Sequence, residues 1–299
     1  MRALVVGAGL MGRGIAIEVS RRAETVTLLD VDEGALRSAK RWIEASIKTL
    51  ESHGLAEESM IDRIEFTNSM EQCRNADIVF EAVPEDVSLK GRVLGDIERA
   101  VGESVPICTN TSVIRLGELA RFLERRSRFL GVHWMNPPFV MPLVEVVVTD
   151  GTDRGVVDFV RSFLEEVGKT VVVCRELSVV NRFNAAVLSE ALRIMESDGM
   201  SHEDIDVVWR YHLAVLYLLF GPFGNLDYIG LDTVMLAFRH LVSGEAEPPE
   251  WLAEKVRRGE LGVKTGSGIY RYEGAPEEVY SMRAEKILRL FEFLRKTGE

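Results

Sequence analysis

Three glycines near the start of the chain separate a short β-branched run from an amphipathic run. Residues 7–12 read Gly-Ala-Gly-Leu-Met-Gly, after the apolar residues 3–6 and before a helical pattern over 12–21. In a strand–turn–helix unit the first glycine allows a tight turn, the second lets backbone approach a pyrophosphate, and the third permits close packing. The helix N-terminus then offers free N–H groups to phosphates. We therefore predict a dinucleotide site that includes Gly7, Gly9, Leu10, Met11 and Gly12.

Asp30 meets a second requirement of a dinucleotide site. It ends the β-branched run that follows the glycine turn, close to the spacing of roughly 20 residues at which the fingerprint places an acidic residue. A carboxylate there is expected to bind the adenosine ribose hydroxyls and to repel a 2′-phosphate, which favours NAD over NADP. Two other readings are open: the glycines make only a turn that Asp30 follows as a helix cap, or the fingerprint holds FAD, which uses the same pattern.

Strand and helix patterns alternate from the start of the chain to about residue 175. This alternation is typical of βαβ units and predicts an α/β fold, a Rossmann-type doubly wound, mainly parallel sheet. Residues 32–63 are too long for one crossover helix and contain a turn signal at Ser52-His53-Gly54, so we predict a helical hairpin there. The expected strands are residues 3–6, 26–29, 64–67, 78–82, 106–109, 130–132, 144–149 and 170–174.

The pattern changes after Cys174. Apolar residues from Val179 to Met195 keep a helical period, and no clear strand follows. Further helices are expected over 205–219, 232–241, 250–258 and 276–295. We therefore predict an NAD-binding Rossmann domain over residues 1–177 and an all-α C-terminal domain over 178–299.

Composition excludes several classes of partner. The chain has 36 Lys and Arg against 47 Asp and Glu, a net charge of −11, which makes nucleic acid or an anionic membrane a poor partner. The longest apolar run, 213–220, is far too short to span a bilayer. Three cysteines without a Cys-x-x-Cys pattern, and histidines without metal-ligand spacing, predict a cytoplasmic protein with no metal.

One histidine has the surroundings that alcohol oxidation needs. Removing hydride from a secondary alcohol requires a base for the hydroxyl proton, and histidine titrates near neutrality. His133 and Glu145 lie on successive strand–loop segments, which can bring them together in space. A carboxylate that orients the ring would stabilise the imidazolium that forms. Alone, His133 would more readily be structural; Asn136 and Asn181 nearby favour a catalytic dyad.

Five clusters at or just beyond strand ends carry a resemblance to a known family. In order they are residues 81–85 with Lys90, 110–112, 133–137, 143–146, and Asn181-Arg182. With Gly221-Pro222-Phe223, residues 227–232 and residues 264–270, they make the chain similar to the L-3-hydroxyacyl-CoA dehydrogenase family, such as 3-hydroxybutyryl-CoA dehydrogenases. The likeness spans nearly the whole chain, and the joint order of the motifs is highly specific.

The resemblance implies roles for further residues. It implies that Ser112 and Asn181 bind the reacting oxygen of the substrate or position the base. It implies that Ser46 contacts the CoA moiety, although His53 stands where the family would have a lysine after this serine. It also implies contacts to the nicotinamide half of NAD from Glu85, Lys90, Asn110, Asn136 and Lys264.

Simpler readings exist for some of these residues. Residues 110–112 could form only a turn and a helix cap, and Glu85 with Lys90 only a solvated ion pair. The chain also departs from the family: Leu177-Ser178 stands where Gly-Phe is usual, residues 215–220 lack the usual Gly- and Pro-containing turn, and Gly224 replaces a Glu.

These observations predict an NAD-dependent dehydrogenase of a short-chain L-3-hydroxyacyl-CoA, with a homodimer formed through the helical domain. Two alternatives stay open. One is a dehydrogenase of a free hydroxy acid, of the L-gulonate or carnitine type. The other is a non-catalytic NAD-binding protein.

Overall fold

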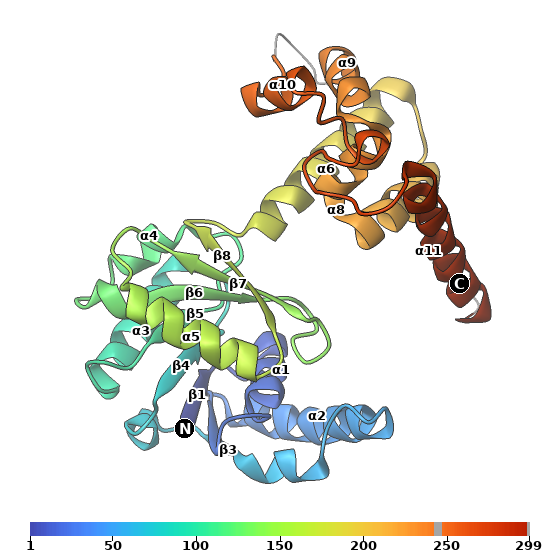
Figure 1. Ribbon diagram of the computed structural model, residues 1–299. Helices are drawn as coiled ribbons and strands as arrows, with labels where there is room; N and C mark the ends of the chain where they lie inside the picture. Colours follow the sequence, from blue (N-terminus) through green and yellow to red (C-terminus); the bar gives the residue numbers. More distant parts are fainter. Residues whose placement is uncertain (242–246, 298–299) are drawn as a thin grey trace. The chain divides into compact units, whose positions relative to one another are not determined.

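The structure is a computed structural model that describes residues 1–241 and 247–297 (Figure 1). The chain divides into two compact units, the first over Met1–Leu188 and the second from Ser189. The division falls within a helix, later in the chain than the boundary that we predicted at residue 177. The first half of that helix therefore belongs with the first unit, and each unit is described by itself.

The first unit is built on one sheet of eight strands, in the order β3-β2-β1-β4-β5-β6-β7-β8. All neighbours are parallel except β6 and β7, which are antiparallel. Each predicted strand is present, with ends close to those expected, which confirms the α/β class. The strands are β1 Arg2–Val6, β2 Thr25–Leu29, β3 Ile64–Thr67, β4 Ile78–Glu81, β5 Ile107–Thr109, β6 Phe129–Trp134, β7 Leu143–Val148 and β8 Thr170–Arg175.

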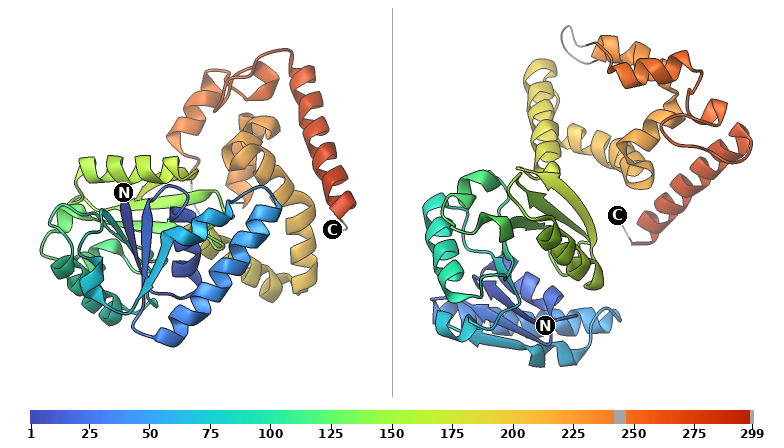
Figure 2. Two further views of the ribbon diagram at one scale, coloured as in Figure 1. Left: turned by 90° about the horizontal axis from the view of Figure 1, so that it is seen from below. Right: turned by 60° about the vertical axis from the view of Figure 1, so that its left-hand side comes forward.

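Helices cover both faces of this sheet (Figures 1 and 2). Side chains alternate between the faces along a strand, and β1 shows the result: Ala3 and Val5 join one buried cluster, Leu4 and Val6 the other. The first cluster contains residues of α1 Leu10–Val19, α2 Glu33–Ser52 and α5 Arg154–Glu166; the second contains residues of α3 Val87–Ala100 and α4 Leu116–Ala120. A sheet buried on both faces needs continuous apolar strands, as the sequence has.

The segment after β2 forms one long helix rather than a pair. Asp32 caps α2 by accepting a hydrogen bond from Gly34 N, and the helix runs for 20 residues to Ser52. The return limb of the expected hairpin is the 3₁₀ segment η1 Glu58–Arg63, so the second α-helix of that prediction is wrong. Further 3₁₀ turns are η2 Met70–Cys73 and η3 Arg126–Arg128.

The remaining elements are helical, as predicted. Between residues 179 and 297, the described residues form no named strand, only isolated bridges that pair Ser267 with Gly262 and Arg271. The elements are α6 Val179–Asp198, α7 His202–Val208, the π-helical turn η4 Trp209–Leu213, α8 Ala214–Ile229, α9 Leu231–Leu241, α10 Glu250–Arg257, the 3₁₀ turn η5 Val263–Thr265 and α11 Pro276–Thr297.

The helical run from His202 to Ile229 is long and apolar enough, by length and composition, to cross a membrane. It continues past its predicted end at residue 219, but Gly221 (φ 66°, ψ 168°) breaks it and Pro222 follows. Its far end is held inside the protein by Asp227, a fully buried carboxylate that accepts hydrogen bonds from Ile269 N and the Tyr272 hydroxyl, at 2.8 and 2.9 Å. We therefore interpret the run as two protein-packing helices joined at a kink.

Candidate functional site

The glycine turn joins β1 to α1 in the geometry that its spacing predicts. Gly7 has φ +103°, and a Cβ there would lie 2.8 Å from the carbonyl oxygen of Ala82. A Cβ on Gly12 would lie 1.7 Å from the Gly7 carbonyl oxygen, so only glycine lets the helix pack against the turn. A Cβ on Gly9, in contrast, would meet nothing within 4 Å. The middle glycine therefore faces open space, where a ligand could approach the backbone.

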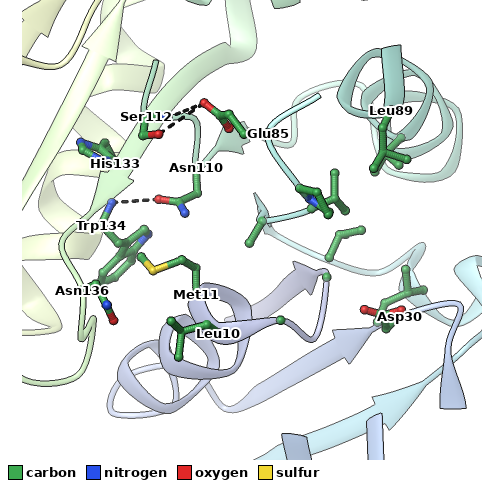
Figure 3. Close-up of a pocket in the computed structure, with 18 of the residues that line it drawn as sticks. Leu10, Met11, Asp30, Glu85, Leu89, Asn110, Ser112, His133, Trp134 and Asn136 are labelled. Carbon is green, nitrogen blue, oxygen red and sulfur yellow. Dashed lines mark hydrogen bonds between the residues drawn. The ribbon is translucent and has the colours of Figure 1, made fainter. Parts of the chain in front are cut away.

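The start of α1 is suited to an anion. Gly9 is the N-cap residue; no side chain caps this end, and the first turn carries no acidic residue. The first N–H groups of a helix lack intrahelical partners and carry partial positive charge. Gly9, Leu10 and Met11 line a cavity of about 840 Å³ (Figure 3). These features fit the pyrophosphate of a dinucleotide.

Asp30 stands at one end of the same cavity, directly after β2. Its Oδ2 accepts a hydrogen bond from Ala8 N at 2.7 Å, and its Oδ1 accepts one from Asp32 N at 3.0 Å. Both bonds hold the carboxylate beside the glycine turn, with acceptor capacity left for a ribose hydroxyl. Around this end lie apolar residues that the sequence did not single out: Val31, Ala35, Met70, Leu89 and Val93.

His133 and Glu145 face each other across two strands. They are register partners in the antiparallel pair β6–β7, so both side chains lie on the same face of the sheet. His133 Nδ1 and Glu145 Oε2 are 2.9 Å apart, and both residues are buried, 7% and 1% exposed. His133 lines the cavity. The predicted dyad is therefore formed, next to the space that the glycine turn borders.

Glu145 receives four hydrogen bonds, which keep it ionised. Besides His133, the Ser178 hydroxyl donates to Oε2 at 2.5 Å, and the N–H groups of Val179 and Val180 donate to Oε1 at 2.7 and 2.9 Å. Burial raises the pKa of this carboxyl, but the four donors outweigh burial and the net pKa is lowered. A carboxylate with only donors around it fixes the proton of His133 on Nδ1, which leaves Nε2 free to act as a base.

Glu85 fastens the loop after β5 to the loop after β4. Its Oε1 accepts hydrogen bonds from the Thr111 hydroxyl at 2.6 Å and from Ser112 N and Val113 N at 2.8 and 3.0 Å. Burial raises its pKa, but these bonds and the charge of Lys90 together lower it. Figure 3 shows Glu85 and Ser112 on the same side of the cavity as His133.

Asn110, Ser112, Asn136 and Asn181 all line the cavity, as predicted for substrate or coenzyme contacts. Asn110 Oδ1 accepts a hydrogen bond from Trp134 N at 3.0 Å, which ties β5 to β6 just beside His133. The Asn181 side-chain amide donates to the Ser112 carbonyl oxygen. These contacts bring together residues that lie far apart in the chain.

Lys90 lies elsewhere than the resemblance implies. Its side chain is fully buried and does not line the cavity. Its Nζ is 2.8 Å from Glu81 Oε1 and 3.5 Å from Glu85 Oε2, so it neutralises two carboxylates. Glu81 also accepts from the Thr109 hydroxyl. In this structure Lys90 therefore reaches the cavity only through Glu85, as a support for that carboxylate.

Ser46 and Lys264 also lie outside the residues that line the cavity. Ser46 is half-buried on α2. His53, which stands where the family resemblance leads one to expect a lysine, follows that helix and bonds the Thr49 carbonyl through Nδ1 at 2.9 Å. Lys264 belongs to the second unit, where its Nζ pairs with both carboxylate oxygens of Asp232. The implied contacts of Ser46 and Lys264 stay predictions.

Two residues of the site received no role from sequence reasoning. Glu81 organises the buried cluster with Lys90, and its place at the end of β4 was the available signal. Ser178 bonds the dyad carboxylate, and the unusual Leu177-Ser178 pair was the signal that could have found it. Among the residues that the structure describes, no group of three potential ligands is placed to hold a metal ion.

Comparisons with known proteins agree with this geometry. Residues 2–177 match the family model "3-hydroxyacyl-CoA dehydrogenase, NAD binding domain", and residues 179–272 match the corresponding C-terminal domain. The chain is 36% identical to a probable 3-hydroxyacyl-CoA dehydrogenase of Caenorhabditis elegans, over 90% of this chain and 92% of that protein. It is 32% identical to human mitochondrial hydroxyacyl-coenzyme A dehydrogenase, over 90% of each.

Solved structures give the same grouping. A 3-hydroxyacyl-CoA dehydrogenase from Archaeoglobus fulgidus matches with a TM-score of 0.88 and 48% identity, over 98% of this chain and 99% of that one. The structure of a 5-formyl-3-hydroxy-2-methylpyridine 4-carboxylic acid 5-dehydrogenase matches with a TM-score of 0.76 and 26% identity, over 98% of each chain.

Proposed function

The chain belongs to the 3-hydroxyacyl-CoA dehydrogenase family, and on this premise we propose that it oxidises a short-chain L-3-hydroxyacyl-CoA reversibly to the 3-ketoacyl-CoA. It is an NAD-dependent oxidoreductase of fatty acid metabolism. The observation that carries the proposal is the placement of the His133–Glu145 pair on the cavity that the glycine turn and Asp30 also line.

The first unit has the residues to hold NAD. The open backbone at Gly9 and the uncapped start of α1 suit the pyrophosphate, and Asp30 suits a ribose that carries free hydroxyls. Asn110, Asn136 and Glu85 would face the nicotinamide half at the other end. When bound there, NAD supplies the acceptor for the hydride that leaves the carbinol carbon.

His133 acts as the general base. Its Nδ1–H is donated to Glu145, so Nε2 is the atom that takes the hydroxyl proton. Glu145 stays anionic and stabilises the imidazolium that results. In the reverse direction the same imidazolium returns the proton to the reduced ketone oxygen, so one residue serves as base and as acid.

Ser112 and Asn181 support this step from the loop after β5 and the start of α6. Both line the cavity with His133. The bond from the Asn181 amide to the Ser112 carbonyl fixes the two segments against each other. We assign to them the orientation of the reacting oxygen, which requires that both side chains keep their present positions when substrate binds.

A second candidate is a dehydrogenase of a free hydroxy acid. It is favoured by the likeness to the 5-formyl-3-hydroxy-2-methylpyridine 4-carboxylic acid 5-dehydrogenase, which covers 98% of both chains and whose named substrate is not a CoA ester. His53, which stands where the family resemblance implies a lysine, points the same way. Competition by free CoA separates the two candidates, because only a CoA-ester enzyme is inhibited.

We propose that the protein is a homodimer through its helical domain. None of the 20 residues of α6 is buried, and large apolar side chains are exposed on α6 and on the helical elements that follow it, among them Leu192, Tyr211, Leu218, Leu236 and Leu288. Such exposure is typical of a surface that a partner covers. Light scattering is expected to give twice the chain mass of 33.5 kDa, and Leu218→Asp is expected to lower that value.

A cytoplasmic location stays a proposal. It is supported by three free cysteines, Cys73, Cys108 and Cys174. Burial raises the pKa of the Cys73 thiol to about 11, so this side chain is inert rather than reactive.

The test of the function is a steady-state assay of the purified protein with acetoacetyl-CoA and NADH. We expect turnover that free CoA inhibits. Turnover of free hydroxy acids without inhibition by CoA would favour the second candidate. NADH binding with no turnover of any hydroxyacyl thioester or hydroxy acid would contradict both and leave a non-catalytic NAD-binding protein.

A further inference from the structure

Ser178 occupies the junction between β8 and α6, directly before the first residue of α6. This residue is only 4% exposed. A buried hydroxyl has to find hydrogen-bond partners, and the partners that it finds belong to the catalytic dyad.

The Ser178 hydroxyl and the His133 ring both bond the same oxygen of Glu145. Its Oγ donates to Glu145 Oε2 at 2.5 Å, the oxygen that lies 2.9 Å from His133 Nδ1. The other oxygen, Oε1, is taken by Val179 N and Val180 N. The two N–H groups at the start of α6 thus hold the carboxylate in place, while Ser178 acts on the oxygen that faces the imidazole.

The same hydroxyl also accepts a hydrogen bond from Asn181 N at 3.0 Å. Asn181 in turn bonds the Ser112 carbonyl through its side chain. One hydroxyl therefore links the acid–base pair to the two residues assigned to the substrate oxygen. No other side chain among residues 1–241 and 247–297 bonds both Glu145 and Asn181.

We propose that Ser178 is a positioning residue of the acid–base pair, which competes with His133 for Glu145 Oε2 and so weakens the hold of the carboxylate on the imidazolium. The inference rests on the proposed function, because it assigns His133 as the base. It deepens that function by giving a role to a residue that bonds both Glu145 and Asn181.

The competition has a definite direction. A hydroxyl that donates to Oε2 draws negative charge away from the bond with His133. Without the hydroxyl, more of the negative charge on Oε2 interacts with the imidazolium, which becomes more stable. The imidazolium is then favoured over the neutral ring, so the acid limb of the activity profile is expected to move to higher pH than in the wild type.

Other charged or titratable groups around Glu145 do not reproduce this effect. Burial, and to a smaller extent the charge of Glu145, raise the pKa of the Cys174 thiol on β8, so the thiol stays neutral. Arg182, one turn into α6, is exposed to solvent, which screens its charge. The Ser178 hydroxyl is thus the group whose removal changes the environment of the dyad without adding or removing a charge.

The test compares four proteins: wild type, Ser178→Ala, Ser178→Thr and Ser178→Cys. The readouts are the pH profile of kcat/KM for hydroxyacyl-CoA oxidation and an NMR titration of the His133 ring, assigned with His133→Gln. For Ser178→Ala we expect the acid limb and the titration midpoint to move up by about half to one pH unit, or about 3- to 10-fold in kcat/KM below the limb. Ser178→Thr keeps the hydroxyl and is expected to follow the wild type.

One additional variant, and the Cys variant already named, keep the test decisive. Ser201 caps α7 through the same kind of bond, to Asp204 N, but contacts no catalytic residue, so Ser201→Ala should leave both midpoints unchanged. If Ser178→Ala does not fold, Ser178→Cys, which keeps the volume but donates weakly, should still shift the midpoint upward.

Unshifted midpoints in Ser178→Ala and Ser178→Cys, or a Thr variant that behaves like the Ala variant, would overturn the proposal. The NMR titration needs no substrate, so it also decides the matter if the wild-type protein turns over no acyl-CoA. Failure of the proposed function and failure of this inference are therefore distinguishable.

Discussion

The two ends of the cavity recognise their ligands by different means. At the ends of β1 and β2 the contacts come mainly from backbone, namely an open glycine and the uncapped first turn of α1, with one side-chain carboxylate, Asp30. At the ends of β6 and β7 they come from side chains, His133 and Glu145, held by a buried hydrogen-bond network. The first end can bind a phosphate but has no group that moves a proton; the second has such a group.

This difference shows how an acidic chain holds an anionic coenzyme. The net charge of −11 repels anions at a distance, so backbone dipoles at the glycine turn have to supply local attraction. The catalytic end is free to carry buried carboxylates, because each has its own donors. Substitutions at the two ends should therefore have different effects. Those at the His133–Glu145 pair should change turnover, and those at the glycine turn should change coenzyme affinity.

The sharpest test of this separation is His133→Ala. General acid–base catalysis contributes about 10²–10⁴-fold, and kcat is expected to fall by that factor while NADH affinity is kept. His202→Ala is a matched control, because His202 also lies near a glutamate, Glu203, at 3.1 Å, but on the surface. Kinetics and NADH fluorescence titration measure the two quantities, and full activity of His133→Ala would refute the catalytic role.

The glycine turn offers a paired substitution with opposite outcomes. Gly12→Ala forces a Cβ to within 1.7 Å of the Gly7 carbonyl, so the turn must distort and the free energy of unfolding should fall by about 2–3 kcal/mol. Gly9→Ala meets no protein atom within 4 Å and should leave Tm unchanged, yet weaken NAD binding about tenfold, because the added methyl group stands where the pyrophosphate approaches. Wild-type NAD affinity of Gly9→Ala would show that the coenzyme does not lie on this backbone.

Asp30→Asn tests the carboxylate at the same end. The amide oxygen can still accept from Ala8 N, which keeps the side chain beside the glycine turn, but the amide NH2 group cannot accept from Asp32 N, so that bond is lost. Loss of the charge should weaken NAD binding by about 1.5–2 kcal/mol and reduce the preference over NADP, with kcat nearly unchanged. The KM values for both coenzymes measure this, and an unaltered ratio between them would contradict the role given to Asp30.

The smallest expected effect is on acid stability. Hydrogen bonds outweigh burial and lower the pKa of Glu145, so its contribution to the free energy of unfolding is present above the ordinary glutamate pKa of 4.5 and is lost as pH falls below it. Glu145→Gln removes this proton linkage, and its unfolding free energy should fall less steeply below pH 4.5. Denaturant titrations at several pH values give the slope of unfolding free energy against pH for the wild type and for Glu145→Gln. Equal slopes would show that Glu145 is not the group responsible.

The glycine end could be predicted from the sequence because its contacts are local. Turn, helix start and packing all depend on residues 7–12, and the eight strands follow from continuous apolar runs. The dyad was only suggested, by the spacing of His133 and Glu145 along the chain. What brings these two residues together is the antiparallel register of β6 and β7, which the loop between them does not reveal.

The burial of individual side chains, and hydrogen bonds between residues distant in the sequence, could not be predicted from the sequence. Lys90 was expected at the nicotinamide, but its side chain is fully buried and pairs with Glu81, the last residue of β4, a pairing that no sequence periodicity predicts. The bond between Ser178 and Glu145 joins residues that are distant in the chain, and it exists because β8 runs parallel to β7 and ends beside it. Such contacts depend on tertiary packing rather than on local pattern.

Hydride acceptor, base and substrate oxygen are expected to meet in one cavity of the first unit. The most direct measurement is a crystal structure of the protein with NAD and a 3-ketoacyl-CoA. We predict the pyrophosphate at the start of α1 and the reacting oxygen at hydrogen-bond distance, about 2.6–3.2 Å, from His133 Nε2. A coenzyme bound away from the glycine turn, or a reacting oxygen beyond the reach of His133, would contradict the account.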